Sequence, residues 1–209
     1  MYSRFTITAQ DLALIRGDRL LFKHCNFTVS SGQVLYIKGA NGAGKTSLLN
    51  TLTGFIEPDN GAFSVSPENH FHTWLTRNTL YLGHHTGIKS ALTVTENLAF
   101  YARLRGVTNP DFTSAIAAVG LAGFDEQLAA HLSQGQKRRI ALARLLIEPV
   151  ALWILDEPLV ALDVDGQAWL CGLIEQQVNN GGAVIVTSHQ PLTLNCTVSE
   201  LELAGVGNV

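Results

Sequence analysis

The sequence has few cysteines and no long hydrophobic run. Its three cysteines, Cys25, Cys171 and Cys196, are odd in number and lack the C-x-x-C spacing of zinc and redox motifs. This favours a reducing cytosolic environment, in which we expect ordinary buried thiols. The longest apolar run, Val150–Leu155, is far shorter than the roughly 20 residues that span a bilayer as a helix. If the protein acts at a membrane, a partner must supply the spanning segment.

A marked excess of charge of either sign is also absent. The chain has 14 basic and 17 acidic residues and a formal net charge of −3, so no broad basic surface for nucleic acid or an anionic membrane is expected. Any anion site must therefore be local. The basic run Lys137–Arg139 is predicted to be a solvated helix face or a neighbour of a phosphate. There are no internal repeats or low-complexity segments, and a hydrophobic fraction of 46% in 209 residues favours one compact domain.

The N-terminal third reads as strands followed by a loop and a helix. Phe5–Leu14 and Leu20–Val29 flank a tight turn and predict a hairpin, and the alternating start excludes a secretory signal. Val34–Lys38 then runs straight into a glycine-rich loop. The following residues predict a short amphipathic helix, with Gly54 as its stop.

The remaining two thirds change from helices back to strands. Residues Leu92–Leu146 show helical periodicity in three segments. The later runs ALWILD and AVIVTSH are almost continuously apolar, which is typical of buried parallel strands, and a predicted helix at Asp165–Val178 separates them. The alternation predicts an α/β fold with a parallel sheet.

The glycine-rich loop GANGAGKT, Gly39–Thr46, fits the pattern G-x-x-x-x-G-K-[ST]. In this pattern backbone N–H groups surround a polyphosphate, the lysine reaches the outer phosphates and the hydroxyl binds Mg²⁺. Its place between a strand and a helix strengthens the match, because the helix N-terminus also favours an anion. The loop predicts a site for ATP and Mg²⁺ made by Asn41, Gly42, Ala43, Gly44, Lys45, Thr46 and Ser47.

A second motif, LWILDEP, is an apolar strand that ends in Asp156 and Glu157. Adjacent residues at a strand end point in opposite senses, so the two acids can have different tasks. We expect Asp156 to help hold Mg²⁺ and Glu157 to polarise the attacking water, since phosphoryl transfer needs both. The alternative is a strand followed by an exposed acidic turn, which the phosphate loop makes the weaker interpretation.

A third motif, LSQGQKRR, places a small hydroxyl before a predicted helix, with Ser133 as its N-cap. An ordinary capped helix is the alternative interpretation. Because the chain has one phosphate loop for one nucleotide, a second anion site is best explained if it faces the γ-phosphate bound by another copy. The residues of this predicted site are Ser133, Gln134, Gly135 and Gln136.

Together with His189 after VIVTS, these ordered motifs resemble the ATP-binding cassette family over almost the whole chain. The resemblance implies an α/β P-loop NTPase core with a parallel sheet, an N-terminal antiparallel β subdomain and an inserted helical subdomain. The core would comprise residues 1 to about 84 and about 136 to 209, and the helical subdomain about 85 to 135.

The same resemblance implies roles for single residues. Glu157 and His189 would be catalytic, polarising water and sensing the γ-phosphate, and Asp163 of the segment Ala161–Asp163 would contact a second copy. ATP would then hold two copies face to face, and hydrolysis would let them part.

Three positions depart from the family pattern. Gln134 replaces the first glycine of the usual signature, which is tolerable if the backbone there needs no positive φ. Arg16 stands where an aromatic side chain usually stacks on adenine, and its guanidinium can stack instead. His85 aligns with a glutamine that usually joins the core and the helical lobe, so His85 is a candidate Mg²⁺ contact beside Thr46 and Asp156.

The phrases GHHTGIKSALTVTENL, LAGFDEQ and LWILDEPLVALDVDG are similar to those of the ATP-binding subunits of the bacterial haem exporter used in cytochrome c maturation. This implies integral-membrane partner subunits and a position on the cytoplasmic face of the inner membrane, with no nucleic acid. No direct haem ligation is expected, because scattered histidines are usually surface or hydrogen-bonded residues. An ABC transporter ATPase for another cargo is the alternative; a soluble cassette protein and a small-molecule kinase are weaker ones.

Overall fold

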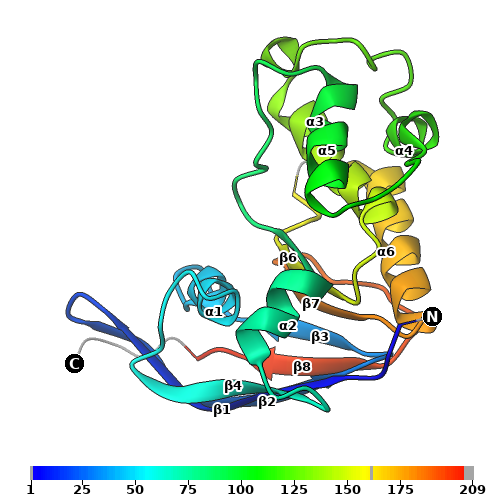
Figure 1. Ribbon diagram of the computed structural model, residues 1–209. Coiled ribbons are helices and arrows are strands. Elements are labelled where there is room, and N and C mark those ends of the chain that lie inside the picture. Colours follow the sequence, from blue (N-terminus) through cyan, green and yellow to red (C-terminus); the bar gives the residue numbers. More distant parts are fainter. Residues whose placement is uncertain (1, 161, 205–209) are drawn as a thin grey trace. The chain divides into compact units, whose positions relative to one another are not determined.

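The computed structural model describes residues 2–160 and 162–204, which form two compact units (Figure 1). Unit 1 contains the chain up to Gly83, Val150–Leu159 and the residues from Ala168 onward; unit 2 contains His84–Pro149 and Val160–Gln167. Among the described residues, no helix is both long enough and apolar enough to cross a membrane.

Unit 1 contains an antiparallel sheet near the N-terminus. Strands β1 (Thr6–Arg16), β2 (Arg19–Ser30) and β4 (Asn60–Ser66) are ordered β2-β1-β4 and appear blue to cyan in Figure 1. The first two are the predicted hairpin, each slightly longer than expected. Their inward side chains alternate with exposed ones, as a sheet with one face on the core requires.

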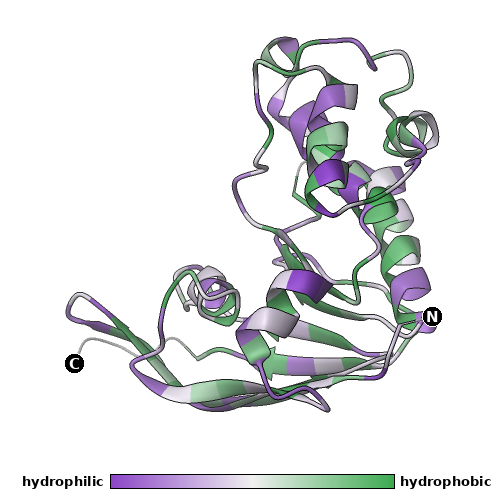
Figure 2. Ribbon diagram, viewed as in Figure 1, coloured by the Kyte–Doolittle hydropathy of each residue, from purple (hydrophilic) through white to green (hydrophobic). Residues whose placement is uncertain are grey.

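The second sheet of unit 1 is parallel, with the strand order β5-β6-β7-β3-β8. Its strands are β5 (Thr79–Leu82), β6 (Leu152–Asp156), β7 (Ala183–Thr187), β3 (Val34–Lys38) and β8 (Val198–Glu202). Every residue of β6 and β7 is buried, and hydrophobic side chains predominate along them (Figure 2). The strands β6, β7 and β3 are neighbours, so the loops that follow their carboxyl ends meet at one edge of the sheet.

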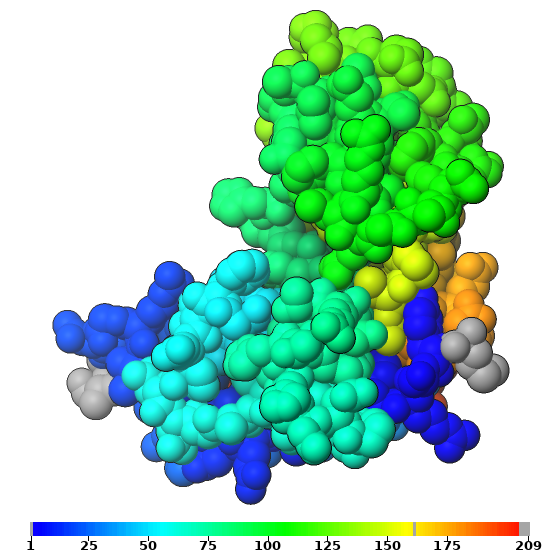
Figure 3. All heavy atoms as spheres, viewed as in Figure 1, coloured from blue at the N-terminus to red at the C-terminus, as the bar shows by residue number. Residues whose placement is uncertain are grey.

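Helices of unit 1 complete its core. Helix α1 (Lys45–Leu52) begins directly after the glycine loop, and Leu48, Leu49 and Leu52 are fully buried. The C-cap of α1 is Thr53, and the next residue is the predicted stop, Gly54. Gly54 has a left-handed backbone, with a φ of 79°, as is common directly after a helix. Helix α2 (Phe71–Asn78) has no counterpart among our predictions. Together with β4 it belongs to the cyan to green surface of unit 1 in Figure 3.

Unit 2 is mainly helical. It contains α3 (Val94–Leu104), α4 (Phe112–Ala118), a 3₁₀ turn at Ala129–His131 and α5 (Gln134–Ile147). All of them lie in the region predicted to be helical, except that α5 extends one residue beyond it. Helix α6 (Val164–Asn179) begins in this unit and continues into unit 1. Both α3 and α5 start with a reciprocal capping box, which satisfies two orphan N–H groups at each start.

A buried ion cluster closes the end of α5. The carboxylate of Glu148 is inaccessible to solvent and accepts from Arg144 Nε at 2.6 Å and from Arg105 Nε at 3.0 Å. The Arg144 guanidinium also lies 3.5 Å from the ring centroid of Tyr101, whose hydroxyl donates to the Gly87 carbonyl. These contacts join α3, α5 and the loop around Gly87 within unit 2, and they leave Glu148 with partners for both oxygens.

The three cysteines differ in burial. Cys25 is buried, which raises the pKa of its thiol to about 11 and keeps it protonated. Cys171 and Cys196 are only partly buried, so the expectation of three buried thiols is correct for Cys25 and wrong for the other two. Cys171 lies within α6, and Cys196 lies in the segment between β7 and β8.

Candidate nucleotide-binding site

The phosphate loop lies between β3 and α1, as predicted. Gly39 has a φ of 144°, and a Cβ there would come within 2.7 Å of the Leu203 carbonyl. Gly44, the N-cap of α1, has a φ of 99°, and a Cβ there would press on Leu21 and Phe22 at 3.3 Å. Both positions therefore require glycine for conformation and for space. The first turn of α1 presents its unpaired N–H groups at this loop, where an anion is favoured.

Lys45 points back over the loop. Its Nζ donates to the Gly39 carbonyl at 2.8 Å and to the Ala40 carbonyl at 3.3 Å, and the residue is 7% exposed. The same Nζ lies 3.4 Å from His189 Nε2. A cation held in this position can exchange two carbonyls for the stronger contact with phosphate oxygens.

Asp156, at the end of β6, joins the loop to the next strand. Thr46 Oγ1 donates to Asp156 Oδ2 at 2.9 Å, and Thr187 Oγ1 donates to Asp156 Oδ1 at 2.7 Å. A hydroxyl and a carboxylate brought together in this way are the hard oxygen donors that Mg²⁺ prefers. The residues present therefore fit an Mg²⁺ ion between Thr46 and Asp156.

Glu157 is held by different partners from those of Asp156. Its backbone has a φ of 49°, an uncommon value for a residue with a side chain, and its N–H donates to the Thr187 carbonyl and to Thr187 Oγ1. Its Oε2 accepts from the His189 N–H at 3.1 Å, and Oε1 lies 3.3 Å from His189 Nε2. The strained turn directs this carboxylate toward the loop that carries His189.

Residues of the phosphate loop, Glu157 and His189 line one pocket of about 350 Å³ in unit 1. Among the described residues that line it, the only aromatic ring is the imidazole of His189. Two lining arginines, Arg16 and Arg19, come from the β1–β2 hairpin, and the Arg19 guanidinium lies 3.7 Å from the place of a Cβ on Gly42. Arg16 is a residue predicted from the sequence, whereas no local pattern marks Arg19. The residues that line the pocket are Arg16, Arg19, Leu21, Asn41, Gly42, Gly44, Lys45, Thr46, Ser47, Glu157 and His189.

The remaining predicted residues lie in unit 2. Ser133 is the N-cap of α5 and accepts from the Gln136 N–H at 3.2 Å, which confirms the predicted cap. Gln134 is absent from the described non-glycine residues with positive φ, so the glycine of the usual signature is not required there. The chain thus keeps a normal helix start despite this departure from the family pattern.

Two further predicted residues of unit 2 have local partners. Asp163 accepts from the Gly166 N–H at 2.9 Å and from Arg139 at 3.1 Å; these two contacts, the first above all, lower the pKa of its carboxyl. His85 is exposed, and its ring contacts the ring of His84. Ala161, which belongs to the predicted dimer-contact segment, lies outside the described residues.

Comparison with known proteins agrees with this geometry. The model of the ABC transporter family matches residues 22–160 of the chain. The chain belongs to the ABC transporter family. The α/β fold with a phosphate loop is therefore established, and family membership supports ATP binding and ATP hydrolysis.

Relatives of this ABC protein extend over nearly its whole length. The cytochrome c biogenesis ATP-binding export protein CcmA of Methylococcus capsulatus is 44% identical over 95% of this chain and 98% of the relative. The protein of the same name from Salmonella typhi is also 44% identical, over 96% and 98%. Among solved structures, an ABC transporter ATP-binding protein from Pyrococcus furiosus matches with a TM-score of 0.80 and 26% identity, covering 95% of this chain and 97% of that one.

A third comparison concerns the fold alone. A dimeric ATP-binding cassette in a post-hydrolysis state, bound to ADP and phosphate, matches with a TM-score of 0.76 and 20% identity over 88% of each chain. Its fold is thus shared with this ABC chain.

Proposed function

We propose that this chain is the ATP-hydrolysing subunit of an ABC-type membrane complex that serves haem export in cytochrome c biogenesis. The observation that carries the proposal is the 44% identity, over almost the full length of both chains, to proteins named cytochrome c biogenesis ATP-binding export protein. An ABC transporter ATPase for a different cargo is the second candidate, because the phosphate loop and acidic pair would serve any cargo equally.

The roles of the site residues follow from their contacts. The loop amides from Asn41 to Ser47 bind the polyphosphate of ATP, and Lys45 leaves its two carbonyls to neutralise the outer phosphates. Thr46 and Asp156 would hold Mg²⁺, and His85 is a further candidate contact for it. When bound, this ion polarises the phosphate oxygens.

The catalytic part of the site is the pair Glu157 and His189. The Glu157 carboxylate accepts a proton from, or orients, the attacking water, and its fixed hydrogen bond to the His189 N–H keeps it at one place. The His189 ring lies between Glu157 and Lys45 and can donate to the γ-phosphate. Water positioning and charge neutralisation are the main contributions that phosphoryl transfer requires from a protein.

A second copy of the chain completes the site in this proposal. Ser133, Gln134, Gly135 and Gln136 at the start of α5 would contact the nucleotide held by the partner, and Asp163 would contact the partner itself. Of these, Ser133, Gln134 and Gly135 would lie in the helical subdomain, about residues 85 to 135, whereas Gln136 and Asp163 would lie in the core, about residues 136 to 209. Two such sites related by a two-fold axis form a closed, self-complementary dimer.

Integral-membrane subunits are the other proposed partners. The chain would work as a peripheral subunit on the cytoplasmic face of the bacterial inner membrane, with haem handled by the partners. No role for nucleic acid is proposed, because the net charge of −3 provides no broad basic surface.

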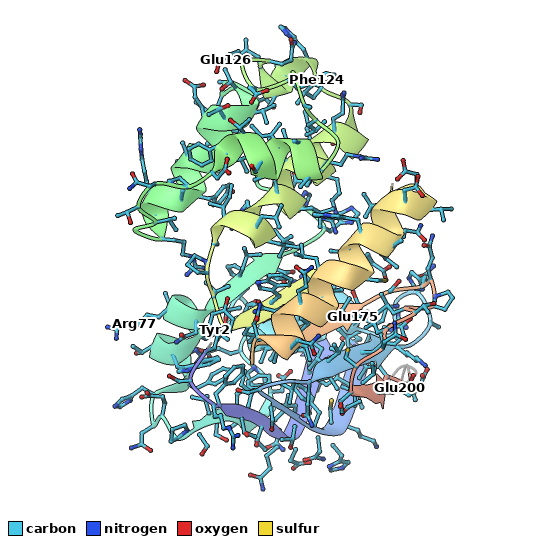
Figure 4. All side chains as sticks on the ribbon, turned by 90° about the vertical axis from the view of Figure 1, so that its right-hand side faces the viewer. Tyr2, Arg77, Phe124, Glu126, Glu175 and Glu200 are labelled. Carbon is cyan, nitrogen blue, oxygen red and sulfur yellow. The ribbon has the colours of Figure 1, made fainter. Side chains whose placement is uncertain are left out.

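Covalent haem staining of c-type cytochromes in the organism tests the cargo. Replacing the protein by Lys45→Ala at matched protein level should abolish the stained cytochromes, because the variant binds ATP too weakly to sustain its hydrolysis. The matched control is Arg77→Ala, which removes an exposed cation from α2 (Figure 4) and should leave staining unchanged. Normal staining with Lys45→Ala would reject the haem pathway and favour the second candidate.

The two arginines of the β1–β2 hairpin are expected to contact different parts of ATP. Arg16→Ala should weaken ATP binding about 2- to 5-fold, because stacking of a guanidinium on a base contributes about 0.5–1 kcal/mol. Binding of inorganic tripolyphosphate, which has no base, should not change. Arg19→Ala should weaken both, since Arg19 lies over Gly42 of the phosphate loop. Isothermal titration measures the four affinities, and equal losses of ATP and tripolyphosphate in Arg16→Ala would reject the base contact.

A further inference from the structure

One buried hydroxyl in β3 reaches the loop that carries His189. Tyr36, two residues before the end of β3, is 8% exposed. Its hydroxyl lies 3.0 Å from the Ser188 carbonyl and 3.1 Å from the Gln190 carbonyl. These are the two carbonyls that flank His189 in the chain, so a single side chain spans the backbone on both sides of the histidine.

The hydroxyl can serve these carbonyls only as a donor. Burial raises the pKa of Tyr36, so the phenol stays protonated at physiological pH. Its one proton is shared between two acceptors, which places the oxygen between them. The Gln190 N–H also donates to Ser188 Oγ at 3.0 Å. Two side chains therefore hold this turn: Ser188, which belongs to it, and Tyr36 of β3.

The geometry of His189 depends on this turn. His189 follows the last paired residue of β7, Thr187, and lies beyond the regular ladder. Its N–H donates to Glu157 Oε2 at 3.1 Å, and its Nε2 lies 3.3 Å from Glu157 Oε1 and 3.4 Å from Lys45 Nζ. A small rotation of the turn would move the ring away from both partners, because no strand pairing holds it.

The strand that carries Tyr36 does not need the hydroxyl for its own position. Strand β3 is paired with β7 on one side and with β8 on the other. Its Lys38 also forms an ion pair with Glu200 of β8, a residue labelled in Figure 4. The Tyr36 ring can fill its place in the sheet as phenylalanine. The contribution of the O–H group is therefore separable from that of the ring.

We propose that Tyr36 is a positioning residue that holds His189 in register with Glu157 and Lys45 for ATP hydrolysis. The inference rests on the proposed ATPase function and adds to it a residue outside the lining of the pocket. Tyr36 acts through His189 and does not touch the nucleotide.

A double-mutant cycle in the full-length protein tests this role. Tyr36→Phe should lower kcat about 3- to 10-fold, as expected for the loss of a buried hydrogen bond, and leave the KM for ATP within about 2-fold. His189→Ala should lower kcat further. The double variant should match His189→Ala, because Tyr36 has nothing to position once the imidazole is gone.

Tyr81→Phe is the matched control. It removes a hydroxyl from β5 of the same sheet, where Tyr81 donates to Asn50 Oδ1 at 3.1 Å, and it should leave kcat unchanged. Multiplicative losses in the cycle, or an unchanged kcat in Tyr36→Phe, would overturn the proposal. A thermal midpoint lowered to the same extent in both tyrosine variants, with equal losses of kcat, would also overturn it, since a merely structural role predicts that pattern.

A second measurement does not depend on activity. In the NMR spectrum, Tyr36→Phe should shift or broaden the ring signals of His189 and leave those of the other six histidines in place. Unchanged His189 signals would reject the positioning role. A wild-type protein without ATP hydrolysis, combined with a His189 signal that responds to Tyr36→Phe, would count against the proposed function and support the positioning role.

Discussion

Glu157→Gln is expected to bind ATP with normal affinity and to hydrolyse it about 10²- to 10³-fold more slowly than the parent protein. Glutamine has the shape of glutamate, and its amide oxygen can still accept from the His189 N–H, which now lies 3.1 Å from Oε2. The amide cannot take a proton from water. The variant therefore keeps the phosphate-binding loop and loses the general base.

The same variant should accumulate as an ATP-bound dimer. Asp156 keeps its contacts with Thr46 and Thr187, and the phosphate loop is unchanged, so every group that binds the triphosphate remains. If each nucleotide is held between two copies, a block in hydrolysis stops them from parting. Size-exclusion chromatography with and without ATP and Mg²⁺ measures this directly.

Glu126→Gln is the control for this experiment. Glu126 is an exposed acid in unit 2 (Figure 4), and its loss changes the charge by the same amount without reaching the phosphate loop. This variant should hydrolyse ATP at the parent rate and show no ATP-dependent dimer. Parent-rate hydrolysis by Glu157→Gln would show that another group activates the water, and monomeric Glu157→Gln with ATP bound would contradict the shared site.

The order of strands and helices could be predicted where local pattern and local chemistry agree. The predicted segment after Ser133 coincides with α5, Gln134–Ile147, because its cap and its apolar repeat both lie within the segment. The phosphate loop could also be predicted, since its glycines, lysine and hydroxyl all lie within Gly39–Thr46. In both cases the interactions that determine the structure are made between residues that are close in sequence.

The segment between about residues 55 and 83 was not predicted. It contains β4, α2 and β5, of which β5 has only four residues and α2 only eight. Such short elements carry too few repeats for a periodicity to be seen, and they form because Phe71, Leu75 and Leu80 find a core made by distant strands. The strand β8 at the edge of the parallel sheet was missed for a similar reason: its exposed side chains give no apolar run.

Contacts within the site were the least predictable part. Tyr36 reaches carbonyls 152 and 154 positions away along the chain, and no local pattern marks it. Thr187 is comparable: its hydroxyl donates to Asp156 and accepts from the Glu157 N–H, although the sequence shows only an apolar run that ends in a threonine. The partners of such residues depend on which strands become neighbours in the sheet.

Lys45→Ala is expected to weaken ATP binding about 10- to 100-fold, the range for losing hydrogen bonds from a charged donor. The Lys45 ammonium already lies over the loop, bound to the Gly39 and Ala40 carbonyls, so it needs only a short movement to reach the phosphates. Alanine leaves the glycine cradle intact but removes the only lysine among the described residues that line the pocket.

Equilibrium dialysis with ATP and Mg²⁺ measures the loss. Lys23→Ala is the control: it removes an exposed lysine from β2 of the same unit, and its affinity for ATP should be unchanged. Lys45→Arg should not restore binding. Lys45 is buried to all but 7%, and the larger, planar guanidinium would have to displace the loop carbonyls or His189.

The comparison of the two site variants separates binding from chemistry. If the assignments are correct, Lys45→Ala lowers affinity and thereby abolishes the ATP-dependent dimer, whereas Glu157→Gln preserves affinity and accumulates the dimer. Normal affinity in Lys45→Ala would mean that the loop amides and the hairpin arginines neutralise the phosphates by themselves. In that case Arg19, which already lies over Gly42, is the cation to replace next, and the double variant Lys45→Ala/Arg19→Ala should lose the binding that either single variant retains.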